Sequence, residues 1–165
     1  DSLAKLAPPA PAVSMSEIQD KEMEAFTGIS IRKTCKHSEV SATLASLYGE
    51  LMMQLQAGKA ELSGPPVCFY HAWGETVELE AVLTTKQKIQ PKAPAKAFSF
   101  AKSKTIQMEY KGNYDLMEPA HQKMQAHLQE HKHQLNGSPF EIYITDPEQE
   151  KDPSKWITII VYPVK

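Results

Sequence analysis

Two histidines one helical turn apart give the chain its clearest chemical motif, in the segment His127-Leu128-Gln129-Glu130-His131. The segment matches the pattern His-x-x-Glu-His, in which two imidazoles bind the zinc ion of a peptidase. Only 34 residues follow it, which leaves little structure for a third ligand and for the groups that would orient the ligands. His121 and His133 add imidazoles without a convincing ligand spacing. We therefore interpret the segment as a solvated helix face that binds nickel or zinc adventitiously, and we expect no metal site and no cofactor.

Two carboxylates, Glu78 and Glu80, alternate with apolar residues in a segment that is typical of a strand. Paired carboxylates carry out acid–base chemistry when burial raises the pKa of one of them. Neighbours on one exposed strand face are more commonly solvated, and we interpret this pair in that way. The two cysteines, Cys35 and Cys68, have apolar neighbours and are expected to be buried free thiols. The sequence holds no glycine-rich phosphate loop and no Gly-x-Ser-x-Gly.

A pair of tyrosines is more informative, because an internal repeat gives the two residues equivalent positions. The repeated residues are Leu55, Gln56, Lys59, Leu62, Gly64, Pro66 and Tyr70, which match Leu128, Gln129, Lys132, Leu135, Gly137, Pro139 and Tyr143 at a constant offset of 73. We infer that residues 23–165 form one domain made of two copies of one unit. Copy one covers about residues 23–85 and copy two about residues 95–165.

Each copy shows the same expected order of elements, which is strand, helix, strand, strand. The first helix starts after Ser38 and ends at Gly58 or Gly64, and its apolar residues follow the helical period. The second helix starts near Tyr114-Asp115, and Asn136-Gly137 closes the connection that follows it. The expected strands are 28–33, 67–71 and 76–85 in copy one, and 105–110, 140–145 and 156–164 in copy two. The pattern predicts an α+β fold, a duplicated β-α-β-β unit whose antiparallel sheet carries both helices on one face.

Alternation along the strand after each helix assigns its side chains to two faces. The hydrocarbon residues expected to pack on the helices are Val67, Phe69, Phe140 and Ile142. The opposite face then carries Tyr70 and Tyr143, with Cys68 and Glu141 beside them. A concave surface of mixed aromatic and polar groups is typical of a small-molecule site. The alternative is that both tyrosines are half-buried strand residues whose hydroxyls reach water.

Four segments, in their order and spacing within the two copies, resemble a known family. They are Tyr110-Lys111-Gly112-Asn113-Tyr114, Gly137-Ser138-Pro139, Tyr143-Ile144-Thr145-Asp146-Pro147, and Trp156 through Tyr162-Pro163-Val164. The chain resembles the GyrI-like domain, the gyrase-inhibitor-like effector-binding domain of AraC- and MerR-type regulators. The resemblance implies a curved antiparallel sheet flanked by two helices, with a ligand groove along the pseudo-two-fold axis. It also implies binding of bulky, mostly apolar or aromatic molecules. Some members of the family hydrolyse strained-ring electrophiles, and one type binds DNA gyrase.

The last strand departs from the family pattern at one position. Many members carry a glutamate in a Trp-x-Thr-Glu-Ile stretch, where it faces the groove and pairs with a cationic ligand or acts as a base. Ile159 occupies that position here. A buried carboxylate needs a partner, and a cation can serve as one, so isoleucine removes both the charge and the preference for a cation. The resemblance therefore implies a drier and more neutral groove, unless Glu141 or Glu109 supplies the acid.

Composition excludes several classes of function. The net charge of −2 and the pI near 6.3 argue against a dedicated nucleic-acid binder. No apolar run approaches the roughly 20 residues that span a bilayer, so we expect no membrane span. The lysine-rich segment from Lys86 to Lys104 is interpreted as a solvated linker between the copies.

The start of the chain differs in composition from the remainder. Residues 1–22 are expected to be an Ala/Pro-rich linker, with a semi-rigid spacer over residues 7–12, and about 20 such residues are too few for a helix-turn-helix. The spacer either ties the domain to another element or is a terminus without a role. Because the first residue is Asp1 rather than Met, we expect a processed or shortened chain. A cytoplasmic location is favoured, and tethering through a removed upstream segment stays open.

The sequence thus predicts a stand-alone domain that binds a hydrophobic or amphipathic small molecule for sensing or sequestration, without binding nucleic acid itself. The predicted ligand-binding residues are Tyr70, Trp73, Glu141, Tyr143, Trp156 and Ile159. The tyrosines would supply flat surface and hydroxyl donors, the tryptophans apolar contact, Ile159 a dry floor and Glu141 a polar anchor. Trp73 has an alternative interpretation as a packing residue at the end of a strand.

Two other functions stay open. One is a hydrolase of strained-ring electrophiles, with Glu141 or Glu109 as base and a tyrosine as acid. The other is a protein-interaction module with a gyrase-inhibitor-like role, whose protein partner the sequence does not identify.

Overall fold

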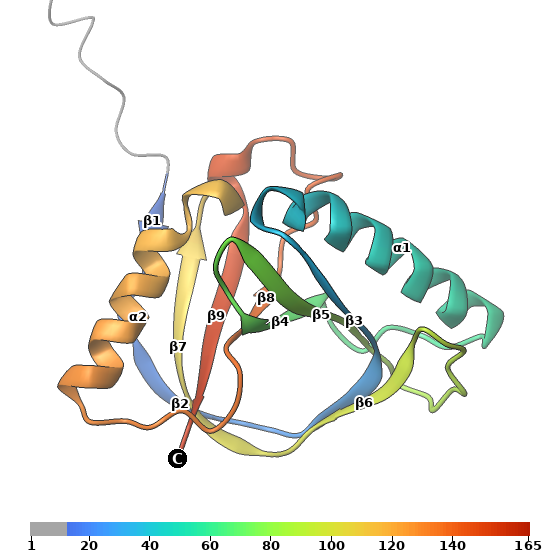
Figure 1. The fold of residues 1–165 in the computed structure, drawn as a ribbon, viewed down its shortest axis with the longest axis horizontal. Helices are drawn as coiled ribbons and strands as arrows, with labels where there is room; N and C mark the ends of the chain where they lie inside the picture. The colour runs from blue at the N-terminus through green and yellow to red at the C-terminus, as the bar shows by residue number, and fades with distance from the viewer. Residues whose placement is uncertain (1–12) are drawn as a thin grey trace, which may run out of the picture.

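The computed structural model describes residues 13–165, and the predicted spacer over residues 7–12 lies outside this range. Two α-helices, α1 (Val40–Ala57) and α2 (Glu118–Glu130), accompany one antiparallel sheet (Figure 1). The strands are β1 (Ser14–Met15), β2 (Gln19–Met23), β3 (Phe26–Lys36), β4 (Val67–Ala72), β5 (Thr76–Thr84), β6 (Lys96–Phe100), β7 (Ser103–Lys111), β8 (Phe140–Tyr143) and β9 (Ile157–Val164). Neither of these helices has the length and apolar character that crossing a membrane requires.

The sheet confirms the predicted duplication. Its order is β1-β7-β9-β8-β4-β5-β3-β6, with β2 also paired to β7, so that β3-α1-β4-β5 and β7-α2-β8-β9 form two halves that meet where β4 pairs with β8. Cys68 lies opposite Glu141 at this junction. The Tyr70 amide donates to the Pro139 carbonyl at 3.0 Å, and the Tyr143 amide donates to the Pro66 carbonyl at 3.0 Å. These two bonds are repeat equivalents of each other, so a pseudo-two-fold axis passes between β4 and β8.

Both helices end in the same turn. Lys59 and Lys132 adopt left-handed φ values of 53° and 55°, and the next amide in each copy bonds back to the carbonyl of Leu55 or Leu128 at 2.9 Å. Such a turn satisfies carbonyl groups that the helix end leaves free. The first helix ends at Gly58, one of the two predicted positions, but Gly58 has a φ of −86° and the following lysine takes the left-handed conformation.

Each half also exchanges a strand with the other. β2 precedes β3 in the chain but pairs with β7, and β6 precedes β7 but pairs with β3. The sheet therefore begins at Ser14, ahead of the domain boundary expected at residue 23, and Lys96 of the expected linker starts β6. In Figure 1, α1 lies at the upper right and α2 at the left, and β2 runs beside α2.

The two faces of the sheet bury different cores. Leu47, Leu51 and Leu55 of α1 pack with Cys68 on the outer face, and Met124 of α2 packs with strands of the second half on the same face. A separate inner cluster contains no residue of either helix. Its buried members are Val67, Phe69, Val82, Phe140 and Val161, and the partly buried ones include Phe26, Phe98, Phe100, Ile142 and Ile159.

The predicted assignment of the two strand faces was therefore wrong. Val67, Phe69, Phe140 and Ile142 lie on the inner face, and the helices cover the face of Cys68 and the tyrosines. The reason is that the curled sheet is buried on both sides, because β6 brings Phe98 and Phe100 over its inner face. A strand face made only of hydrocarbon side chains therefore does not show which side of the sheet the helices cover.

The inner cluster predicts a large loss of stability on truncation. Phe140 is fully buried and stacks on Phe69 with ring centroids 4.4 Å apart. We expect Phe140→Ala to lower the free energy of unfolding by about 3–5 kcal/mol in urea titrations, because the change removes apolar contacts and leaves a cavity. Met53→Ala, at a side chain that is 69% exposed, serves as the control and should change it by less than about 0.5 kcal/mol. Equal effects of the two changes would contradict an inner core.

Candidate functional site

A groove opens on the inner face of the sheet, between β4, β6 and the turn that precedes β8. It encloses about 380 Å³. Its apolar wall is formed by Phe69, Phe98 and Phe100, and its polar wall by His71 and Ser138. A volume of this size lies within the range of ligand pockets in proteins. We name it the phenylalanine groove.

All five phenylalanines of the chain belong to the inner cluster, and three of them line the groove. Phe69 lies 5.1 Å from Phe98 and 6.2 Å from Phe100, measured between ring centroids. Phe140 stacks beneath Phe69, and Phe26 stacks on Phe100 at 4.9 Å. Rings in such offset and edge-on arrangements present both faces and edges to a ligand. The groove therefore offers a rigid aromatic surface.

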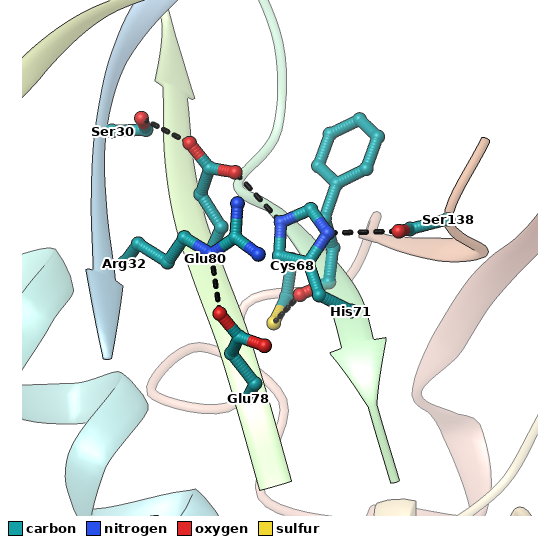
Figure 2. A network of polar contacts seen from close by, with 8 residues as sticks. Ser30, Arg32, Cys68, His71, Glu78, Glu80 and Ser138 are labelled. Atoms are coloured by element: carbon teal, nitrogen blue, oxygen red, sulfur yellow. Dashed lines mark hydrogen bonds and ion pairs between the residues drawn. The ribbon is translucent and has the colours of Figure 1, made fainter. Parts of the chain in front are cut away.

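A chain of hydrogen bonds forms the polar wall (Figure 2). Nδ1 of His71 lies 2.8 Å from Oγ of Ser138, and Nε2 of the same ring lies 2.8 Å from a carboxylate oxygen of Glu80. Ser30 donates to the other oxygen of Glu80 at 2.6 Å. The side chains of His71 and Glu80 are 17% and 15% exposed, so the pair is largely shielded from water.

Three strands and one turn position these groups. His71 ends β4, Glu80 lies in β5 and Ser30 in β3. Ser138 follows Gly137, whose φ of 137° is one that side chains beyond glycine rarely adopt. The interpretation of Glu80 as a solvated carboxylate was wrong, because its neighbours in the curled sheet supply two partners. The interpretation as a solvated carboxylate fits Glu78 better, because Glu78 accepts a hydrogen bond from Arg32 at 2.7 Å in an exposed ion pair.

Glu80 occupies the position in copy one that Ile159 occupies in copy two. Glu80 pairs with Phe69 in the sheet, and Ile159 pairs with Ile142, which is the repeat equivalent of Phe69. Ile159 belongs to the inner cluster and contributes apolar surface there. Glu80 pairs with Phe69 in the sheet and bonds to His71 of the polar wall, so copy one places a carboxylate next to the groove.

The predicted tyrosine site lies on the opposite face, beneath the helices. The hydroxyls of Tyr70 and Tyr143 are 2.9 Å apart, and Tyr143 donates to Glu141 at 2.8 Å. The other oxygen of Glu141 lies 2.7 Å from Nε2 of His121, whose Nδ1 lies 2.7 Å from the hydroxyl of Tyr162. This chain ties α2 to the strands on both sides of the pseudo-two-fold axis. The structure thus brings Tyr70, Glu141 and Tyr143 together, but not on an uncovered face.

The two predicted tryptophans flank this chain from outside. Trp73 is 58% exposed and packs edge-on against Tyr70 at 5.2 Å. Trp156 lies 4.8 Å from Tyr114, and its indole nitrogen donates to the Glu150 carbonyl at 2.7 Å. Ile159 lies on the other side of the sheet, so the six predicted residues do not form one site. Glu109, the other predicted base, is exposed on β7 and apart from both hydrogen-bond chains.

Burial controls the ionisation of the tyrosines. It raises the pKa of Tyr70 and of Tyr143 well above the ordinary value of 10.0, and the nearby charge of Glu141 raises both pKa values further. The same two causes raise the pKa of Tyr162 to about 12, against hydrogen bonding to Gln125, which lowers it. Burial likewise raises the pKa of the Cys68 thiol. These hydroxyls therefore remain protonated donors over the physiological range.

The residues of the phenylalanine groove were missed for identifiable reasons. Phe98 and Phe100 alternate with small residues in a segment that its lysines identified as a linker, although this alternation is itself a strand signal. His71 was noted only as part of a strand end. No local pattern links Ser138 to His71, because 67 residues separate them.

Comparisons with known proteins agree with this architecture. Residues 16–165 match the family described as GyrI-like small molecule binding domain. The EcmrR C-terminal domain has a TM-score of 0.81 and 18% identity, over 90% of this chain and 97% of that domain. The chain spans 57% of EcmrR as seen in its DNA complex, at a TM-score of 0.82 and 19% identity over 90% of this chain.

Two further solved structures share the fold. SAV2435 bound to tetraphenylphosphonium has a TM-score of 0.66 and 18% identity, over 91% of this chain and 94% of that one. A hydrolase from Listeria innocua has a TM-score of 0.59 and 14% identity, over 99% and 97%. No curated protein sequence matches the chain.

The buried tyrosines predict a loss of stability at alkaline pH. A group whose folded pKa is raised contributes stability that is complete below its unfolded pKa and is lost as the pH rises through its folded pKa. Above about pH 10, tyrosines in the unfolded chain ionise, while Tyr70 and Tyr143 stay protonated in the folded chain. Each of them therefore makes the free energy of unfolding fall more steeply with pH, by up to about 1.4 kcal/mol per pH unit. Urea unfolding between about pH 9 and 11.5 should show a shallower decline for Tyr143→Phe. Parallel declines would contradict the burial of this hydroxyl.

Proposed function

Because the chain belongs to the GyrI-like small molecule binding domain family, we propose that it binds hydrophobic or amphipathic aromatic molecules in the phenylalanine groove, and prefers those that carry a positive charge. The observation that carries the proposal is that a groove lined by three phenylalanines also contains His71, whose ring bonds at 2.8 Å to the shielded carboxylate of Glu80. Aromatic faces attract cations, and a carboxylate with little access to water gains from a cationic partner. The proposed role is sensing or sequestration of such molecules.

Charge around the groove fits this preference. Lys102 lines the rim, but its ammonium lies 3.0 Å from Glu22 and 3.7 Å from Glu24, which offset its charge. The fold-sharing protein SAV2435 was seen with tetraphenylphosphonium, a cation that carries four phenyl rings. We further propose that this chain acts without contacting nucleic acid itself, in keeping with its net charge of −2.

A pair of probes tests the site and the role of the charge. Tetraphenylphosphonium and the neutral triphenylphosphine oxide are each titrated calorimetrically against the chain and its variants. We expect Glu80→Gln to lower the affinity for the cation about tenfold and to change the affinity for the neutral probe by less than about twofold. The reason is that the glutamine side chain keeps the shape of glutamate and loses its charge.

Two controls locate the site. Glu78→Gln removes a carboxylate outside the groove, and Trp73→Ala removes an exposed ring on the helix side. Both should leave the affinity for the cation within about twofold. A loss with Trp73→Ala and none with Glu80→Gln would place the ligand on the helix side and contradict the proposal.

A second candidate function rests on the order Ser138, His71, Glu80. A hydroxyl, an imidazole and a carboxylate in hydrogen-bonded sequence can activate a nucleophile, although the two ring nitrogens are used in the reverse order of serine proteases. Ser138 would form a bond to the carbonyl carbon of an ester while its proton passes to His71. The alcohol would leave with that proton, and water would release the acid. The pair expected earlier, Glu141 with a tyrosine, is enclosed beneath the helices.

Ester turnover distinguishes the two candidates. If the second holds, the chain hydrolyses p-nitrophenyl butyrate, and Ser138→Ala lowers kcat/KM at least about 100-fold because the nucleophile is lost. Ser154→Ala, which removes an exposed hydroxyl bonded to Asp152, is the matched control and should change nothing. Turnover that survives Ser138→Ala would rule out this serine as nucleophile, and its absence would leave binding as the function.

A further inference from the structure

Three possible metal ligands meet at the end of α2, away from the phenylalanine groove. They are Asp20 of β2, His127 of α2 and His133 in the turn that follows the helix. Their ligand atoms all lie within 4.8 Å of one another, and Nε2 of His133 is 3.7 Å from a carboxylate oxygen of Asp20. Asp20 precedes His127 by more than 100 positions in the chain, so no sequence motif contains all three residues.

The spacing is close to what one ion requires. Nitrogen and oxygen ligands about 2.1 Å from a tetrahedral zinc ion lie about 3.4 Å from each other. The three ligand atoms, which lie within 4.8 Å of one another, are therefore only slightly farther apart than in a metal-bound site. Imidazole and carboxylate together suit zinc and nickel rather than calcium or magnesium, which prefer oxygen ligands.

The backbone holds both histidines in place. Lys132 takes the left-handed conformation, and the His133 amide bonds to the Leu128 carbonyl at 2.9 Å, which fixes His133 against the last turn of α2. Copy one has the same turn, with Gln54 and Ala60 at the positions equivalent to His127 and His133. The two histidines are therefore a feature of copy two alone and not a requirement of the turn.

The site lies at the surface of the molecule, because Asp20 is exposed and both histidines are only partly buried. His133 also lines a cavity of about 500 Å³ beside Leu128, Leu135 and Tyr162, which gives water access to an open coordination position.

We propose that Asp20, His127 and His133 form a binding site for one divalent transition-metal ion, zinc or nickel, with water as the fourth ligand. The ion would connect β2, which belongs to the first half by sequence, to the helix of the second half. Binding would raise the stability of the folded chain, since unfolding separates the ligands.

The test uses the untagged full chain, freed of metal with a chelator and titrated with zinc chloride. We expect one ion per chain, a higher melting temperature with zinc, and the strong visible absorption of tetrahedral cobalt when Co²⁺ replaces zinc. We expect the affinity for zinc to fall at least about 30-fold in His127→Ala and in His133→Ala, and about tenfold in Asp20→Asn.

Two controls separate this site from casual binding by helix histidines. His131→Ala should weaken zinc less than about threefold, and His37→Ala, at an exposed histidine in the other copy, should change nothing. If His131→Ala lowers the affinity for zinc and Asp20→Asn does not, the ion is bound by His127 and His131, one helical turn apart. That result would overturn the proposal. Metal-free variants must keep the parent melting temperature, and zinc binding that no variant weakens would also overturn it.

Discussion

The pairing of β4 with β8 is the constraint on which the rest of the structure depends. Strands from the two halves bond directly to each other across the pseudo-two-fold axis, so the halves share one sheet rather than packing as separate units. At the axis, Cys68 lies directly opposite its repeat equivalent, Glu141. The side chains of Tyr70 and Tyr143, also repeat equivalents, meet at their hydroxyls, which are 2.9 Å apart. The shared sheet curls and so has an inner face. The strands β2 and β6, which the halves exchange, cover part of this face.

Symmetry of the scaffold contrasts with asymmetry of its charges. On the inner face, the first half carries Glu80 where the second carries Ile159. On the outer face, the second half carries Glu141 where the first carries Cys68. Each face thus keeps one carboxylate of the two that the duplication allows, and each carboxylate bonds to a histidine. Two like charges close to the axis would repel each other in a shielded environment, and a single one needs only one set of partners.

Much of the fold could be predicted from the sequence, but less of the site. Residues matching at a fixed offset revealed the duplication, and apolar periodicity located both helices. The faces of β4 and β8 were reversed because alternation tells which residues share a face and not what covers it. Phe98 and Phe100 were overlooked because lysines dominate their segment. The partners of Glu80 and the association of Asp20 with His133 depend on the curl and on strand exchange, which no local pattern encodes.

Strand exchange has a consequence for each half of the chain. Because β2 completes the edge of the opposite half and β6 does the reverse, a single unit standing alone would leave one edge unpaired and a detached strand with nothing to bond. Two separate copies could satisfy each other by reciprocal donation. In the full chain the two halves make this reciprocal exchange within one molecule, so each sheet edge is completed at no cost in association.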